Sequence, residues 1–350
     1  MLKKFKIGNV KIGHKEKTFI IAEIGVNHNG SLKLAVKLIK EAKKAGADCV
    51  KFQTFTADLL TRKNAKKAPY QIKNTKNKDT QYEMLKKLEL KKEFYPKLIK
   101  ICKKLNIIFL STPYNFEDVD FLQKIGVHGY KFSSMHLTEL KFIDYVSKKK
   151  KPVIISTGMS KMSEILKALN IVKKNKNQNY AVLQCTTNYP SKIQDSNILC
   201  LNSFKKKFKC LVGFSDHTTT NISAITAVAL GAKVIEKHFT LNKNMKGPDH
   251  LCSYNPREFK AYVKDIRMAE LALGKDIKNL SNIEKKNVKI MRRSIHSKKL
   301  IKKGEKFTLN NLVLLRPNDG IPAGKLDLLL NKIAKNDIQP FKKISTKNYK

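Results

Sequence analysis

The chain has 350 residues, 41% of them hydrophobic, and a formal net charge of +44 at pH 7. This length predicts two domains with a full buried core, and no apolar run reaches the roughly 18 residues that a membrane-spanning helix needs. The lysines occur in short runs along the whole chain without an arginine–aromatic platform. That distribution argues against a nucleic-acid-binding protein, although a positive field would attract anionic substrates.

The six cysteines, at positions 49, 102, 185, 200, 210 and 252, form no CxxC pair. Cys49 and Cys185 lie inside apolar runs, which favours reduced and buried thiols. Such thiols are typical of a cytoplasmic protein, and no signal peptide opens the sequence. We therefore expect a cytoplasmic location.

The first part of the chain predicts a hairpin followed by a strand, a helix and a second strand. Residues 1–17 are basic and mixed, and we expect them to cover the bottom of the fold as a hairpin. Residues 19–22 form an apolar strand that ends at Glu23, and residues 48–50 form the next strand, which leads to Lys51. Between them, Ser31 is a suitable N-cap for a helix over residues 32–45, which Gly46 closes.

Residues 56–82 are polar and lack a clear period, so they predict a long loop of the kind that often carries function. Helices over residues 82–88 and 93–105 follow. The pattern of an apolar run that ends in polar groups then repeats, with a helix over residues 222–230 between the last two runs. These further runs lie at residues 107–110, 129–130, 153–155, 181–183, 210–212 and 234–235.

The eight apolar runs, mostly roughly 20–30 residues apart with helical segments between them, predict a (β/α)8 barrel of the TIM type. In that fold the C-terminal ends of the strands build the active site. A doubly wound open sheet is the alternative, but residues 25–30 (GVNHNG) lack the GxGxxG spacing of its phosphate-binding turn.

The predicted catalytic barrel spans residues 1–274 and ends with a helix over residues 255–273. Residues 275–290 are polar and predict a linker. Residues 291–350 predict a small β-rich module, with strands near 295–297 and 312–315 and one helix over 326–333. A segment of this size is expected to rest against another part of the protein.

Two histidines follow the ends of adjacent predicted strands, in the motifs GFSDH (213–217) and VIEKH (234–238). Because adjacent parallel strands end at the same edge of a sheet, His217 and His238 should face one another. Two imidazoles in that arrangement can hold a divalent metal and leave its other positions to water and substrate. The predicted rim also carries Glu23, Lys51, Gln53, Thr112, Lys131, Ser134, Ser156, Ser215 and Glu236.

Lys51 and Lys131 at strand ends have two interpretations. One is a Schiff-base lysine, which a barrel can support. The other is a pair of cations that holds a phosphate or carboxylate with help from Ser156 and Ser215. The histidine pair favours the second interpretation, since a Schiff-base enzyme has little use for a metal. A metal, an anion clamp and a carboxylate together predict carbon–carbon bond formation onto an aldehyde.

Seven motifs in this order and spacing resemble those of the sialic acid synthases, a family that includes the N,N′-diacetyllegionaminate synthases. They are FIIAEIGVNHNG (19–30), KFQTF (51–55), STP (111–113), ISTGM (155–159), GFSDH (213–217), IEKHFT (235–240) and GPDH (247–250). The tail, with RRS (292–294), IKKGE (301–305) and LRP (315–317), is similar to that family's C-terminal antifreeze-like (SAF) module.

The resemblance implies a transferase that condenses phosphoenolpyruvate with an N-acetylated hexosamine and water, giving a nonulosonate and phosphate through C–O cleavage. It implies that His217 and His238 hold Mn²⁺ or Mg²⁺ and that Glu23 carries a proton. The implied catalytic residues are Glu23, Lys51, Lys131, His217 and His238. The implied substrate contacts are Gln53, Asn74, Thr112, Ser134, His136, Ser156, Thr187, Tyr189, Ser215, Asp249 and Arg316. It also implies a domain-swapped homodimer in which Arg316 reaches the sugar site of the other subunit.

Two departures from the family pattern leave the acceptor sugar open. The chain has His136 where many relatives carry a glutamate that orients sugar hydroxyls, and Asn188 where close relatives often carry glutamate. N-acetylmannosamine, giving N-acetylneuraminate, is the first hypothesis, and a diacetylated 6-deoxy sugar, giving diacetyllegionaminate, is the alternative. A basic nucleic-acid-binding protein and a non-catalytic scaffold are the hypotheses from other classes.

Overall fold

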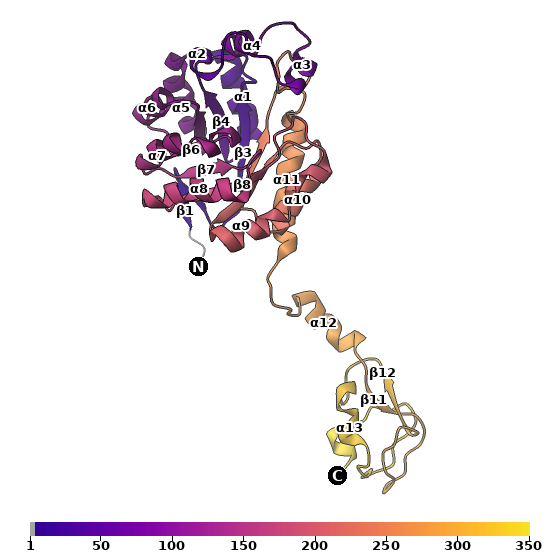
Figure 1. Ribbon diagram of the computed structural model, residues 1–350. Coiled ribbons are helices and arrows are strands. Elements are labelled where there is room, and N and C mark those ends of the chain that lie inside the picture. The colour runs from indigo at the N-terminus through magenta and orange to yellow at the C-terminus, as the bar shows by residue number, and fades with distance from the viewer. Residues whose placement is uncertain (1–3) are drawn as a thin grey trace. The chain divides into compact units, whose positions relative to one another are not determined.

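The computed structural model describes residues 4–350, which divide into two compact units, one ending at Gly274 and the other spanning Lys275–Lys350 (Figure 1). Positions 1–3 of the predicted hairpin lie outside the described residues. No helix within residues 4–350 is long and apolar enough to cross a membrane.

The first unit is a closed barrel of eight parallel strands, which confirms the predicted TIM-type fold. Around the barrel each strand pairs with its neighbour in the chain, and β10 closes the ring by pairing with β3. The strands are β3 (Phe19–Gly25), β4 (Cys49–Thr54), β5 (Ile108–Pro113), β6 (Tyr130–Phe132), β7 (Val153–Ser156), β8 (Tyr180–Cys185), β9 (Leu211–Asp216) and β10 (Val234–His238).

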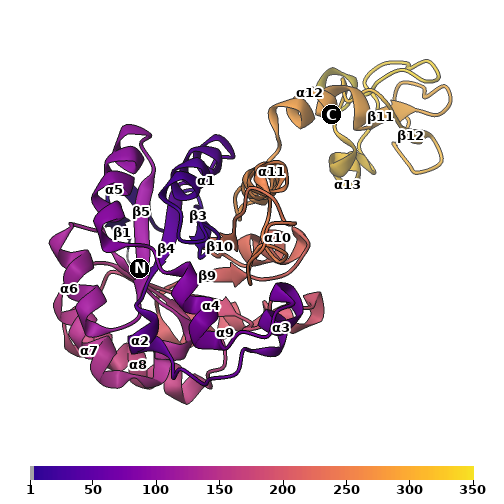
Figure 2. The same cartoon turned by 90° about the horizontal axis from the view of Figure 1, so that it is seen from above.

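Helices lie around the ring of strands (Figure 2). Those of the first unit are α1 (Leu32–Lys44), α2 (Ala57–Leu60), α3 (Pro69–Thr75), α4 (Gln81–Leu88), α5 (Tyr95–Lys104), α6 (Phe116–Lys124), α7 (Leu140–Lys148), α8 (Met162–Lys174), α9 (Cys200–Phe208), α10 (Ile222–Ala229) and α11 (Pro256–Leu273). Ser31 caps α1 as predicted, because its side chain accepts a hydrogen bond from the Leu34 amide. Asn255 and Glu258 form a capping box at the start of α11.

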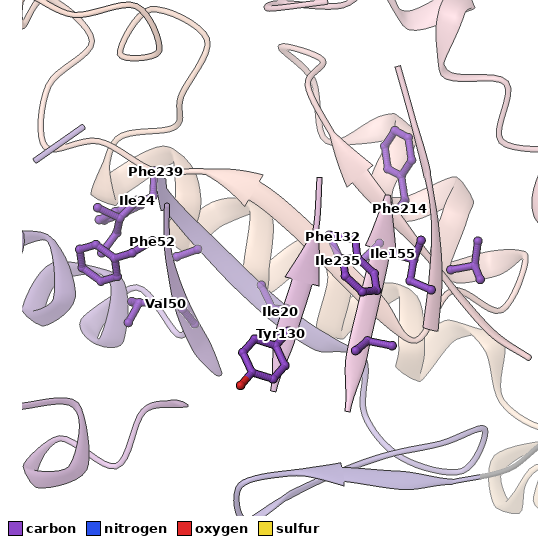
Figure 3. Packing of buried hydrophobic residues seen from close by; sticks show 14 of the residues in the cluster. Ile20, Ile24, Val50, Phe52, Tyr130, Phe132, Ile155, Phe214, Ile235 and Phe239 are labelled. Carbon is purple, nitrogen blue, oxygen red and sulfur yellow. The ribbon is translucent and has the colours of Figure 1, made fainter. Parts of the chain in front are cut away.

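The side chains of each strand alternate between two environments. The outward set packs against the helices in the main hydrophobic core, which includes Ile24, Val50, Phe52 and Ile155 (Figure 3). The inward set at the lower end is apolar, with Ile21, Cys49, Leu110, Ile154, Leu183 and Val234 in one buried cluster.

An antiparallel hairpin of β1 (Phe5–Ile7) and β2 (Val10–Ile12) closes this lower end, as the sequence predicts. Its side chains Phe5, Ile7 and Ile12 are buried in the same cluster as the apolar inward set. The bottom of the barrel is therefore a packed core, and polar inward side chains occur only above it on the same strands.

The segment 56–82, predicted as a loop, contains the short helices α2 and α3. Both are too short to show a period in the sequence, and tertiary contacts stabilise helices of this length more than propensity does. A buried ammonium holds the segment together: the Nζ of Lys67 donates to Thr75 and to the carbonyl of Asn77, both at 3.0 Å, and pairs with Asp79.

The second unit contains α12 (Asn282–Met291), β11 (Ser294–Ser297), β12 (Leu312–Leu315) and α13 (Leu326–Leu329). Strands β11 and β12 pair antiparallel. Most of α12 occupies the predicted linker, where Ser281 and Glu284 form a capping box. The predicted helix over 326–333 is shorter than expected, because it ends at Leu329 and Asn331 adopts a positive φ of 67°.

Candidate active site

Charged side chains form a layer at the C-terminal ends of the strands, directly above the apolar interior. Glu23, Lys51, Lys131 and Glu236 come from four different strands, and each is at most 4% exposed. Glu23, Lys51 and Glu236 stand two residues beyond inward-facing apolar positions of β3, β4 and β10. Lys131 is the register partner of the inward-facing Ile154, so strand alternation turns all four side chains to the same side. The fold therefore removes four ionisable groups from water together.

Glu236 connects the two lysines. Its Oε1 lies 3.0 Å from the Nζ of Lys131 and also accepts a hydrogen bond of 3.0 Å from the Ser215 hydroxyl. Its Oε2 lies 3.8 Å from the Nζ of Lys51. Lys51 makes a closer ion pair with Glu23, at 2.8 Å, so the two lysines and two glutamates form one connected network.

Burial and the lysines push the pKa values of the two carboxyls apart. Burial raises the pKa of Glu23, and the charge of Lys51 offsets this only in part. Burial acts in the same direction on Glu236, but Lys131 and Lys51 outweigh it and lower the pKa of Glu236 to about 2. The lysines thus favour the ionised form of Glu236, whereas Glu23 is the carboxyl suited to exchange a proton.

The two histidines face one another as the sequence predicts, with ring centroids 5.5 Å apart. The Nδ1 of His217 lies 2.7 Å from the carbonyl oxygen of Thr186, so Nδ1–H donates there and leaves Nε2 as the free ligand atom. His238 has an Nδ1 without a hydrogen-bond partner, 3.7 Å from Asp249. Burial, together with the charge of His217, lowers the pKa of His238 well below its usual range, so its imidazole is neutral.

A cavity of about 340 Å³ opens beside His238 and Asp249. Part of its lining is polar and includes Gln53, Tyr70 and Tyr189, and the Tyr189 ring lies 4.1 Å from that of His217. Another part of the lining is an apolar wall, supplied by residues after β3 and β4 and by α2 and α4. The side chains of this wall are Val26, Phe55, Leu60, Met84, Leu85 and Leu88.

Several other predicted contact residues lie close to this centre. The buried Ser156 hydroxyl has no hydrogen-bond partner, and Lys51 donates to the Thr112 hydroxyl at 3.2 Å. The Oγ of Ser134 accepts from the Gly158 amide at 3.0 Å. Asn74 donates to the carbonyl of Pro248 at 2.7 Å, which ties α3 to the loop that carries Asp249.

His136 is the predicted contact residue whose side chain the structure turns away from the cavity. His136 is fully buried in an aromatic cluster, 4.8 Å from the Phe142 ring, while its neighbour Met135 lines the cavity. Thr187 is exposed but lies beside Ser134, since a Cβ added to Gly158 would overlap the Thr187 Oγ1 and lie 2.7 Å from the Ser134 Oγ. Arg316 is an exposed residue of the second unit. His136 was predicted to contact the substrate because it follows Lys131 in the chain. The short 3-10 turn Ser134–Thr138 instead directs its side chain into the aromatic cluster.

Three features of the site were not assigned a role from the sequence. Glu236 stands two residues before His238 on one strand, and this spacing alone indicates that both face the interior. The apolar wall has no comparable signal, because α2 and α4 lie in and after a polar segment. The third is the buried Cys185, whose Sγ lies 4.0 Å from the Nδ1 of His217.

The family model described as the NeuB family matches residues 38–278, and the SAF domain model matches residues 292–340. The N,N′-diacetyllegionaminic acid synthase of Campylobacter jejuni is 48% identical over 96% of this chain and 98% of its own. The pseudaminic acid synthase of the same species is 39% identical over 95% of this chain and 96% of its own. The crystal structure of an N-acetylneuraminic acid synthetase from Leptospira borgpetersenii has a TM-score of 0.74 and 30% identity, covering 82% of this chain and 96% of its own.

We predict that His136→Phe makes the protein more resistant to acid. Burial, with a contribution from the charge of Lys131, lowers the pKa of His136 to about 3, and its Nε2 has no partner. A depressed histidine pKa favours unfolding once the unfolded chain binds the proton, so this stability is complete above pH 6.5 and falls as the pH is lowered toward 3. At pH 5 the variant should gain about 2 kcal/mol relative to the wild type through this linkage.

Urea unfolding between pH 7.5 and 5 measures the effect. His128→Phe, at an exposed position, is the control. Burial and the charge of Lys151 also lower the pKa of His128, so this variant should change the pH dependence in the same direction but by less than His136→Phe does. Equal slopes of unfolding free energy against pH for His136→Phe and the wild type would contradict the buried neutral state of His136.

Proposed function

The chain belongs to the NeuB family of nonulosonic acid synthases, and from that premise we propose that it condenses phosphoenolpyruvate with an N-acetylated hexosamine derivative and water, releasing phosphate. The observation that carries this proposal is the buried network of Lys51, Lys131, Glu23 and Glu236 beside the histidine pair.

The network supports the binding of an anion with two acidic groups. Lys51 and Lys131 are held in fixed positions by Glu236, so a phosphate and a carboxylate meet ammonium groups that need little reorganisation. Charge-assisted hydrogen bonds are about twice as strong as neutral ones, and burial strengthens them further. The unpartnered hydroxyl of Ser156 supplies one more donor.

His217 and His238 fit a divalent cation. One imidazole is oriented by a backbone carbonyl, and the other has an unpartnered ring nitrogen in a buried setting. Within residues 4–350 no group of three or more His, Cys, Asp or Glu side chains could hold an ion. Two protein ligands would therefore leave the remaining positions to water and substrate. Such a cation would polarise the aldehyde of the open-chain sugar.

The remaining chemistry falls to the side chains of the charged layer. The methylene carbon of phosphoenolpyruvate forms a bond to the aldehyde carbon, water adds at C2, and phosphate leaves with C–O cleavage. The aldehyde oxygen needs a proton, and the attacking water loses one. Glu23 is suited to both transfers, since burial raises its pKa and Gln53 and Lys51 hold its two oxygens at 3.1 and 2.8 Å.

For the acceptor we propose 2,4-diacetamido-2,4,6-trideoxymannose, the alternative considered from the sequence, ahead of N-acetylmannosamine. The apolar wall of the cavity supports this choice, because this sugar has a methyl group at C6 and a second acetyl group where N-acetylmannosamine has hydroxyls. A hydroxyl that loses water against an apolar wall without a partner costs about 1–3 kcal/mol. The relative with 48% identity is named for the matching product.

We also propose that the chain forms a homodimer in which Arg316 reaches the sugar site of the other subunit. Exposed apolar side chains support a protein contact: Leu271 on α11 is 82% exposed, and Ile283 on α12 is 70% exposed. Sedimentation equilibrium should give twice the chain mass, and Arg316→Ala should raise the KM for the sugar. A monomer with full activity would contradict this proposal.

Phosphate release from phosphoenolpyruvate with Mn²⁺ tests the reaction and the acceptor. We expect kcat/KM to be at least about tenfold higher with the diacetamido sugar than with N-acetylmannosamine, since an apolar pocket discriminates against an added hydroxyl by roughly that factor or more. Met84→Gln, which makes the wall polar at a side chain that is 4% exposed, should reduce this preference.

Met268→Gln makes the same chemical change on the exposed face of α11 and should leave the preference unchanged. A preference for N-acetylmannosamine would contradict the proposed acceptor and leave the reaction standing. Release with neither sugar, or equal release by His217→Ala, would contradict the reaction itself.

A further inference from the structure

A second buried ion pair lies on the outer side of the strands that carry the histidines. Asp216 is the last residue of β9 and immediately precedes His217, and Lys237 immediately precedes His238 on β10. Both side chains are 0% exposed, and the Nζ of Lys237 lies 3.2 Å from the Oδ2 of Asp216. The two residues are direct partners in the parallel register of β9 and β10.

Because successive side chains of a strand point to opposite faces, this pair stands behind the active site. On the inner face, one position earlier, Ser215 pairs with Glu236, and their side chains are hydrogen-bonded at 3.0 Å. One position later are the two imidazoles, 5.5 Å apart. The outer pair thus lies between two inner pairs, and a change in its geometry moves both.

The outer pair belongs to a network without open positions. The Oδ1 of Asp216 accepts hydrogen bonds from the amide and the hydroxyl of Thr218, both at 2.8 Å, and its Oδ2 accepts from the Tyr262 hydroxyl at 2.9 Å. Lys237 donates to the carbonyl of Thr218 and lies 4.3 Å from the ring centre of Tyr254. These contacts bind the segment on both sides of His217 to β10 and to α11.

We propose that Asp216 and Lys237 are positioning residues that hold His217 and His238 at the separation a single divalent cation requires. A buried ion pair is weak evidence for added stability, because an apolar pair of the same size is often as stable. The contribution of this pair is geometric, because the ion pair and its directed hydrogen bonds fix the register of β9 and β10 next to His217 and His238. The proposal rests on the metal ligation proposed above.

The test is the affinity for Mn²⁺, measured as free Mn²⁺ by electron paramagnetic resonance during titration of the folded protein. Lys237→Met keeps the side-chain length and removes the charge. We expect the Kd for Mn²⁺ to rise about tenfold or more, as for other groups that orient metal ligands. Tyr262→Phe removes one hydrogen bond to Asp216 and should weaken Mn²⁺ binding by a smaller factor.

Asp118→Asn is the matched control for stability. Asp118 is also 0% exposed and pairs with Lys92 at 3.0 Å, at the start of α6 and away from both histidines. It should lower the melting temperature without changing the Kd for Mn²⁺. Wild-type affinity in folded Lys237→Met overturns the proposal, as does an equal loss in Asp118→Asn.

If Lys237→Met does not fold, Tyr262→Phe decides, and wild-type affinity in that variant overturns the proposal. A wild-type protein that does not bind Mn²⁺ contradicts the proposed metal ligation and this inference with it. A wild-type protein that binds Mn²⁺ while Lys237→Met binds equally well contradicts this inference alone.

Discussion

The structure of the site depends on one constraint, the burial of two lysines at the ends of parallel strands. An uncompensated ammonium in that position would cost several kcal/mol, so each must be paired. Glu236 contacts Lys131 at 3.0 Å and Lys51 at 3.8 Å, and Glu23 completes the balance. Burial favours the neutral form of both lysines and the two glutamates oppose it, so the pKa of Lys51 is raised on balance and that of Lys131 is lowered. The same contacts fix both ammonium groups in place for an anion that carries a phosphate and a carboxylate.

Strand alternation explains how one barrel accommodates both a dry core and this charged layer. At the lower end of the barrel, inward residues such as Ile154 and Leu183 fill the interior. The polar layer begins two residues further along the strands. Most outward positions are apolar, and the outward ion pair of Asp216 and Lys237 lies behind the histidines. Ionic contacts are thus concentrated on both faces of β9 and β10, the strands proposed to hold the metal.

Much of the fold and the centre of the site could be predicted from the sequence, since each strand ends in polar residues with a characteristic spacing. The histidine pair and both lysines were found in this way. The position of Glu236 between Lys131 and Lys51 could not be predicted in this way, because it depends on which strands face one another across the barrel. His136 is placed by a 3-10 turn without a sequence period. The apolar wall depends on the packing of α4, itself predicted over residues 82–88, against Val26 and Phe55, and that packing is not visible in the sequence. Residues 275–290 were predicted as a linker because they are polar, although Ser281 and Glu284 have the spacing of a capping box that begins α12.

The binding of phosphoenolpyruvate to the two buried lysines is the central claim, and calorimetric titration tests it most directly. We expect one molecule to bind per chain of the Mn²⁺-loaded protein. Lys131→Met should weaken binding about a hundredfold, which corresponds to the roughly 3 kcal/mol of a buried charge-assisted contact. Wild-type affinity in Lys131→Met, with the fold intact, would show that the lysine pair serves stability alone and would contradict the account.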